Sequence, residues 1–137
     1  IKYEIIGSEL PISIFGNANL IGQVFLNLLN NAFDEITAYD DRWIKIEISK
    51  TEKNVLISVS NSGPKISSEI VEKIMEPFYT TKEVGKGTGL GLSISTGIIK
   101  KHKGTLEVDL SAEYTKFVIT LPLAESDQHF QDVNEAS

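Results

Sequence analysis

The residues of this sequence best suited to chemistry are three glycines at alternate positions. They are Gly87, Gly89 and Gly91, and they adjoin an apolar run, 90–99, that has helical spacing. Because glycine lacks a Cβ, a phosphate group can approach its backbone closely. The first N–H groups of a helix have no intrahelical partner and carry the positive end of the helix dipole. We therefore expect a polyphosphate site here, although a glycine cluster alone is also typical of a flexible loop.

The segment before these glycines carries further groups that can bind phosphate. Residues 78–86 lack any hydrophobic period, and we interpret them as a mobile flap. Their candidate ligands are Thr80, Thr81, Lys82 and Lys86.

Two amides on the longest expected helix are a second candidate site. Apolar residues recur at helical spacing from residue 17 to about residue 39, with Asn17 or Asn19 available as the N-cap. Asn27 and Asn31 are four residues apart, so they stack one turn apart at the margin of the apolar face. They are either functional amides or boundary polar groups satisfied by solvent or backbone.

The other elements predict the scaffold that holds these residues. Strict alternation at 43–49 and 54–60 indicates a β-hairpin. We also expect edge strands at 2–6 and 12–15, a turn at 61–66, a helix at 67–75 with Ile70, Val71 and Ile74 inward, a helix from 89 to about 101, and strands at 105–110 and 115–121. These elements predict an α/β (α+β) fold, a two-layer sandwich in which three helices cover one face of a mixed sheet.

Composition narrows the possible functions. A chain of 137 residues with 41% apolar residues suits one domain, expected over 1–123, and the polar residues 124–137 suit a disordered tail. The net charge of −6 argues against binding to nucleic acid or an anionic membrane. The absence of cysteine excludes disulfides and thiolate chemistry, and no apolar run is long enough to span a membrane. The two histidines, His102 and His129, are expected at the surface.

Four motifs together resemble a known family. NLLNNAFDE (27–35), NSGPKI (61–66), EPFYTTK (76–82) and GKGTGLGLS (85–93) resemble, in this order, the catalytic ATP-binding domain of sensor histidine kinases. That domain belongs to the superfamily shared with DNA gyrase B, heat-shock ATPase chaperones and mismatch-repair ATPases. The resemblance extends to about Leu121 and implies a Bergerat-type ATP-binding fold with a mixed, mostly antiparallel sheet.

The resemblance assigns catalytic roles to the two amides. Asn31 takes the position of the asparagine that coordinates the Mg²⁺ bridging the ATP phosphates, and Mg²⁺ accepts such a neutral oxygen ligand. Asn27 takes the position where hydrolysing relatives carry a glutamate. Because an amide cannot activate water as a base, the resemblance favours a kinase over an ATPase.

The resemblance also implies the nucleotide contacts. They are Asn31, Asn61, Gly63, Ile66, Phe78, Lys82, Lys86, Gly87, Thr88, Gly89, Leu90, Gly91, Leu92 and Thr115. Lys82 and Lys86 are either mobile cations that neutralise phosphate or solvated surface charges, and Phe78 is either a latch or a core aromatic. Thr115 matches a threonine near the adenine, but Tyr114 replaces its usual glycine neighbour.

Two residues depart from the first glycine box. Asn61 replaces an aspartate that accepts a hydrogen bond from the adenine amino group, which predicts adenine binding weaker by about 1 kcal/mol, roughly fivefold. An amide nevertheless offers one donor and one acceptor that can match an adenine edge. Lys65 replaces the second glycine and requires either a conformation that suits a side chain or some strain.

The resemblance implies the catalytic ATP-binding domain of a two-component sensor histidine kinase. Such a domain presents Mg²⁺–ATP to a histidine on a separate dimerisation domain of the same protein, and a response regulator receiver domain acts downstream. The expected location is cytoplasmic, without membrane contact by this domain. The alternatives are a degenerate nucleotide-binding module that serves as a docking surface, and an ATPase of the same superfamily.

Overall fold

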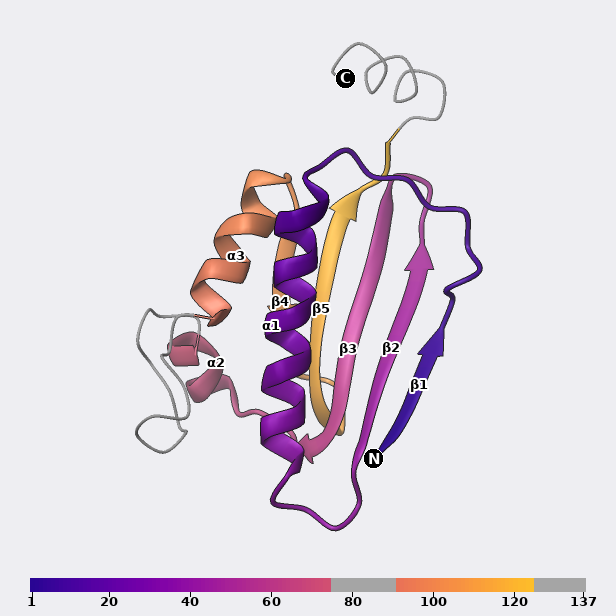
Figure 1. Cartoon of the computed structure of the whole chain (residues 1–137). Coiled ribbons are helices and arrows are strands. Elements are labelled where there is room, and N and C mark those ends of the chain that lie inside the picture. Colours follow the sequence, from indigo (N-terminus) through magenta and orange to yellow (C-terminus); the bar gives the residue numbers. More distant parts are fainter. Residues whose placement is uncertain (75–90, 125–137) are drawn as a thin grey trace.

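A five-stranded sheet with helices on one face forms the protein, and the computed structural model describes residues 1–74 and 91–124 (Figure 1). The strands are β1 (Lys2–Ile6), β2 (Trp43–Lys50), β3 (Asn54–Pro64), β4 (Thr105–Val108) and β5 (Tyr114–Pro122). The helices of these ranges are α1 (Ala18–Ile36), α2 (Ser68–Ile74) and α3 (Gly91–Lys101). The expected two-layer α/β fold is confirmed.

The sheet is mixed and mostly antiparallel, as expected. Its strand order is β1-β2-β3-β5-β4, and only the pairing of β1 with β2 is parallel in the described part of the chain. The second expected edge strand, 12–15, is wrong. Ile12 and Ile14 pack against the core while Ser13 lies exposed, so the alternation reflects side-chain burial along an extended segment outside the sheet.

Strand β3 is longer than its alternation predicts. The expected turn at 61–66 is wrong for its first four residues, because β3 continues through Pro64 and pairs there with Tyr114 of β5. The register shifts between Asn61 and Pro64, which marks an irregularity in the ladder. Glycine and proline are tolerated in strands at such irregularities. A turn-like composition therefore marks a distorted strand end here.

Helix α1 supplies much of the packing against the sheet. Asn17 is its N-cap, and the side-chain oxygen accepts hydrogen bonds from the backbone N–H groups of Asn19, at 2.9 Å, and Leu20, at 3.1 Å. The helix ends at Ile36, three residues before the expected end. Its buried side chains recur every four residues. Val24 and Leu28 pack in the main core cluster with sheet residues such as Val55 and Ile119, and Ala32 and Ile36 form a second cluster with Ile44 of β2.

Helix α2 only partly follows its expected orientation. Ser67 caps it, since its backbone carbonyl accepts from Val71 N at 3.0 Å. Val71 is half-buried, but Ile70 is 37% exposed, so the expectation that Ile70 points inward is wrong. A helix of 7 residues has fewer than two turns and buries only a narrow face.

His102 is not the surface residue that the sequence suggested. Its side chain is half-buried, its Nε2 atom accepts from Asn17 N at 3.0 Å, and its Nδ1 atom lies 2.8 Å from the carbonyl oxygen of Ile98. A Cβ at Gly16 would lie 2.4 Å from the ring, so only glycine fits there. The imidazole thus links the end of α3 to the start of α1. His129 lies outside the described residues.

No helix within 1–74 and 91–124 combines the length and the apolar character needed to cross a bilayer.

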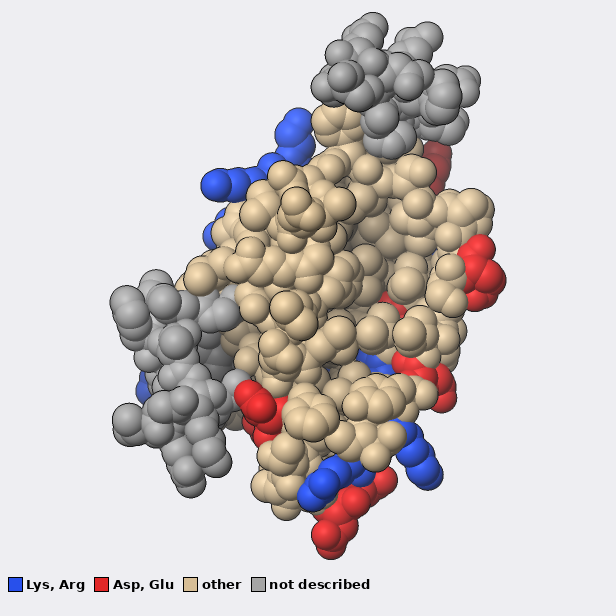
Figure 2. All heavy atoms as spheres, in the orientation of Figure 1, with Lys and Arg blue, Asp and Glu red and all other residues tan. Residues whose placement is uncertain are grey.

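The surface over α1 and the sheet consists mainly of uncharged residues in the view of Figure 2, and charged side chains of both signs lie mostly around its margin. The tail expected at 124–137 falls, beyond its first residue, outside the described ranges.

Candidate functional site

Three polar side chains recur every four residues along α1. Asn27 and Asn31 are half-buried and Glu35 is exposed. Residues spaced by four lie on the same face of a helix, and eight residues span about 12 Å along its axis. We call these three residues the α1 stripe. It connects two parts of the molecule that lie far apart in the sequence.

One end of the α1 stripe faces helix α3. The Nδ2 atom of Asn27 donates to the hydroxyl of Ser95 at 3.3 Å, and Ser95 is fully buried at 0% exposure. The two helices run in opposite directions (Figure 1), because Asn17 at the start of α1 also meets His102 just after α3. Moving one turn toward the C-terminus of α1, from Asn27 to Asn31, therefore corresponds to moving one turn toward the N-terminus of α3, from Ser95 to Gly91. Asn31 lies level with the start of α3 at Gly91, at the margin of the core.

The other end of the α1 stripe meets the ends of β3 and β5. A Cβ built on Gly63 would lie 2.8 Å from Glu35 Cγ, 2.7 Å from Asn61 Oδ1 and 3.4 Å from Thr115 Oγ1. These contacts leave no room for a side chain at Gly63, which explains the glycine. They also bring three of the predicted nucleotide contacts, Asn61, Gly63 and Thr115, into one cluster, which we call the strand-end cluster.

Asn61 and Thr115 hold the backbone of the strand-end cluster. They stand opposite each other on β3 and β5, and they are 3% and 4% exposed. Asn61 Oδ1 accepts from Gly63 N at 2.7 Å, and the Thr115 hydroxyl donates to the carbonyl oxygen of Pro64 at 2.8 Å. Both side chains point to the face of the sheet that the helices cover, since they share the alternation of Val59 and Phe117.

Aromatic side chains border the strand-end cluster. Trp43 and Tyr114 pack edge to face, with ring centroids 5.1 Å apart and an interplanar angle of 81°. The backbone N–H of Trp43 donates to the Ser62 hydroxyl at 3.2 Å. Tyr114 of β5, which replaces the glycine expected from the family motif, therefore packs against Trp43 of β2 across the intervening strand β3, although 46% of Tyr114 remains exposed.

Lys65 has a conformation that suits its side chain. Of the two alternatives for this residue, the strained one is wrong, because Lys103 is the only non-glycine residue with positive φ in the described ranges. Ile66 and Leu92 are half-buried and pack against the main hydrophobic core. The expected roles of these two residues toward a nucleotide stay predictions.

Several predicted site residues lie outside the described residues. They are Phe78, Lys82, Lys86, Gly87, Thr88, Gly89 and Leu90, together with the flap expected at 78–86. Gly91 is the first residue of α3. The described part of the predicted site thus comprises the two amides, the start of α3 and the strand-end cluster.

Glu35 is the site residue that sequence reasoning missed. Its Cγ atom would lie 2.8 Å from a Cβ built on Gly63. The sequence spacing could have indicated Glu35, because it follows Asn31 by four residues, as Asn31 follows Asn27. The polar face of α1 therefore continues by one further turn, to the point where α1 reaches the end of β3. No group of three or more histidine, aspartate or glutamate residues suited to a metal ion occurs in 1–74 and 91–124.

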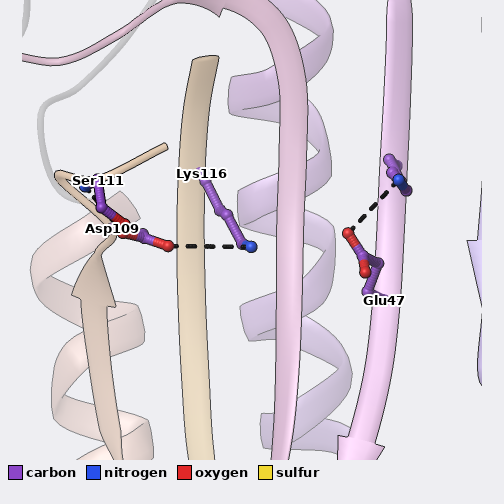
Figure 3. Close-up of polar contacts among 5 residues, drawn as sticks. Glu47, Asp109, Ser111 and Lys116 are labelled. Carbon is purple, nitrogen blue, oxygen red and sulfur yellow. Dashed lines mark hydrogen bonds and ion pairs between the residues drawn. The ribbon is translucent and has the colours of Figure 1, made fainter. Parts of the chain in front are cut away.

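A separate charged cluster lies on the opposite face of the sheet. Lys116 follows Thr115 on β5 and so points away from the helices, and its Nζ atom lies 3.9 Å from Asp109 Oδ2 (Figure 3). Asp109 Oδ1 also accepts from the hydroxyl of Ser111 at 2.6 Å and from its backbone N–H at 2.9 Å. The hydrogen bond from the Ser111 hydroxyl is the main reason that the pKa of Asp109 lies below its usual value.

Known proteins resemble this chain in sequence and in fold. The family model described as "Histidine kinase-, DNA gyrase B-, and HSP90-like ATPase" matches residues 16–125. Sporulation kinase A of Bacillus subtilis (strain 168) is 40% identical over 112 residues, which are 81% of this chain and 18% of that protein. The C4-dicarboxylate transport sensor protein DctB of Rhizobium meliloti is 32% identical over 90% of this chain and 20% of its own length. The chain thus spans a fifth or less of these two relatives.

Solved structures with similar folds include histidine kinase domains. The catalytic domain of histidine kinase ThkA superposes with a TM-score of 0.76 at 34% identity, covering 88% of this chain and 79% of that one. ThkA in complex with response regulator protein TrrA matches with a TM-score of 0.72 at 31% identity, over 91% of this chain and 35% of that chain.

Proposed function

Because this chain belongs to the family of histidine kinase-, DNA gyrase B- and HSP90-like ATPases, and within it to the histidine kinase catalytic domains, we propose that it presents Mg²⁺–ATP for phosphoryl transfer to a histidine. The proposal rests mainly on the position of the α1 stripe. It joins the glycine-led start of α3 to the strand-end cluster, so one ligand with a phosphate end and a base end can contact both.

The described residues fit a magnesium ion that arrives with phosphate. They include no cluster of three acidic or histidine side chains in 1–74 and 91–124, so a dedicated all-protein metal site is absent there. Mg²⁺ usually binds through one or two protein oxygens together with water and substrate phosphates. Asn31, level with the start of α3, would supply one such oxygen. Magnesium would neutralise charge on the phosphates.

Asn27 supports transfer to a separate acceptor over hydrolysis. Its amide has no basic group to activate water, and its Nδ2 atom is directed at Ser95. The contribution of α1 is therefore to orient the phosphates. Positioning and charge neutralisation are the main contributions of proteins to phosphoryl transfer.

The acceptor histidine belongs to a different domain in this proposal. His102 has both ring nitrogens in contact with the backbone, one with Asn17 and one with Ile98, so it is a structural residue. We propose a dimerisation and histidine phosphotransfer domain of the same protein as the direct partner, and a response regulator receiver domain downstream, by analogy with ThkA and TrrA. We propose residues 1–123 as the nucleotide-binding domain.

Calorimetric titration tests the proposal directly. ATP is titrated into the chain with Mg²⁺ and again with EDTA, and we expect binding in the micromolar to millimolar range that is stronger with the metal. No heat of binding up to millimolar ATP would contradict the proposal and favour a docking module. Release of inorganic phosphate by the chain alone, abolished by Asn27→Ala, would instead favour an ATPase.

A further inference from the structure

The amide of Asn61 has a fixed orientation inside the strand-end cluster. Its oxygen arm is turned toward Gly63, whose backbone N–H donates to Oδ1 at 2.7 Å. The reverse orientation would bring the NH₂ group against the same N–H, so two donors would face each other. The arm that points away from Gly63 is therefore the NH₂ group, a donor.

This donor is buried without an acceptor. Asn61 is 3% exposed, and no residue in 1–74 or 91–124 accepts a hydrogen bond from its Nδ2 atom. A buried polar group without a partner costs free energy, and each one in a folded protein calls for an explanation. The explanation that suits a nucleotide site is an acceptor on the bound ligand.

Thr115 complements Asn61 in the opposite sense. Its hydroxyl hydrogen is committed to the carbonyl oxygen of Pro64 at 2.8 Å. Toward a ligand, the Thr115 oxygen can therefore only accept. Since Asn61 and Thr115 are cross-strand partners, the cluster offers one donor and one acceptor side by side.

We propose that this site binds 6-oxopurine nucleotides, those of inosine and guanosine, at least as tightly as ATP. The inference rests on the nucleotide-binding function proposed above. A 6-oxopurine has an acceptor at O6 and a donor at N1–H, the counterparts of Asn61 Nδ2 and Thr115 Oγ1. The 6-amino group of adenine is a donor and cannot bond to the Asn61 NH₂ group. The Asn61 NH₂ group can meet adenine only at an acceptor of the ring, the nitrogen N1.

Binding of ATP and ITP to the same chain tests the proposal, since the two bases differ only at position 6 and in the proton on N1. Wild-type protein, Asn61→Asp and the control Asn54→Asp are titrated with each nucleotide in the presence of Mg²⁺. Asn54 begins β3 at the opposite end of the strand from the cluster, so its variant matches the change of charge. We expect wild type and Asn54→Asp to bind ITP at least as tightly as ATP, and Asn61→Asp to favour ATP by roughly tenfold.

The outcomes separate this inference from the proposed function. A tenfold preference for ATP over ITP in wild type would overturn the inference and leave nucleotide binding intact. The same would follow if the ratio of the ATP and ITP affinities were equal in wild type and Asn61→Asp. Failure of every nucleotide to bind to any of the three proteins would overturn both.

A measurement on wild type alone covers the case in which Asn61→Asp does not fold. Purine riboside triphosphate lacks the 6-amino group but keeps the ring acceptor N1. We expect it to bind within about twofold of ATP, because the amino group of adenine makes no bond to the Asn61 NH₂ group. A tenfold loss of affinity would show that the amino group is recognised and would overturn the inference.

Discussion

The two ends of the α1 stripe are built differently. At the strand-end cluster, backbone and side chains of β3 and β5 are held by short hydrogen bonds inside the sheet. One turn into α3, the Nδ2 atom of Asn27 on α1 donates a hydrogen bond to the buried hydroxyl of Ser95 at 3.3 Å. The first end has a fixed pattern of donors and acceptors. The second end has backbone N–H groups and amides that suit any phosphate.

The differences from the family motifs are concentrated at the strand-end cluster. Asn61 belongs to that cluster, Tyr114 borders it and Lys65 follows the end of β3, whereas the amides of α1 and the glycine-rich sequence 85–93 match the family motifs. We infer that changes at the sheet alter which base is preferred, and that changes at the helices alter whether a nucleotide binds at all.

The largest effect is expected at the helix end. Asn31→Ala removes the proposed protein ligand of the metal, so the affinity for Mg²⁺–ADP should fall roughly thirtyfold, or about 2 kcal/mol, while metal-free binding changes little. Calorimetry with and without Mg²⁺ measures both. Asn30→Ala is the matched control, because Asn30 is the exposed neighbour of Asn31 on the same helix. Equal losses in the two variants would contradict the role of Asn31.

A second variant breaks the sheet end by crowding it. Gly63→Ala introduces a Cβ 2.7 Å from Asn61 Oδ1 and 2.8 Å from Glu35 Cγ, so the free energy of unfolding should fall by about 1–3 kcal/mol. Urea denaturation measures the change. Gly97→Ala is the control, because a Cβ there has nothing within 4 Å and should stabilise α3 by up to about 1 kcal/mol. Unchanged stability of Gly63→Ala would show that the cluster is loosely packed.

A third variant changes the chemistry of the sheet end without crowding it. Asn61→Asp supplies a charged acceptor to the adenine amino group, so ADP should bind about fivefold more tightly, roughly 1 kcal/mol. Calorimetric titration of ADP measures the difference. An unchanged or weaker affinity would argue against the proposed contact of residue 61 with the base.

The smallest effect is expected at the charged cluster on the far face of the sheet. The Ser111 hydroxyl, with smaller help from Lys116, keeps the pKa of folded Asp109 below its ordinary value of 3.8. The ionised carboxylate therefore stabilises the fold above about pH 4, and this contribution is lost as the pH falls through the lower pKa of the folded state. Thermal melts of wild type and Asp109→Asn should differ slightly at pH 6 and converge near pH 2. A constant difference would contradict this cause, and nucleotide binding should be unaffected.

Much of the fold could be predicted because its elements have clear periods. Apolar spacing located α1, and alternation located β2 and most of β3. The strand expected at 12–15 is absent from the sheet because side chains can alternate between buried and exposed along an extended segment that pairs with no strand. The extension of β3 was missed because Asn, Gly and Pro indicate a turn equally well, and only the partner strand decides between the two.

The sequence indicates individual residues of the candidate site, but not the hydrogen bonds and contacts between them. Family motifs indicated Asn27, Asn31 and Asn61 individually. Whether the amide of Asn61 donates or accepts depends on where the backbone N–H of Gly63 points, which a sequence does not specify. The contact of Glu35 with Gly63 likewise depends on the angle at which α1 crosses the sheet.

Replacing Mg²⁺ by paramagnetic Mn²⁺, which prefers similar oxygen ligands, is the most direct test of where the metal–nucleotide complex binds. In NMR spectra of the chain with ADP and Mn²⁺, we expect the backbone amide signals of residues 27–35 and 91–95 to broaden most, while those of β1 stay sharp. Broadening centred on β1 and β2, or equally strong without ADP, would contradict the proposed position of the nucleotide between α1 and the start of α3.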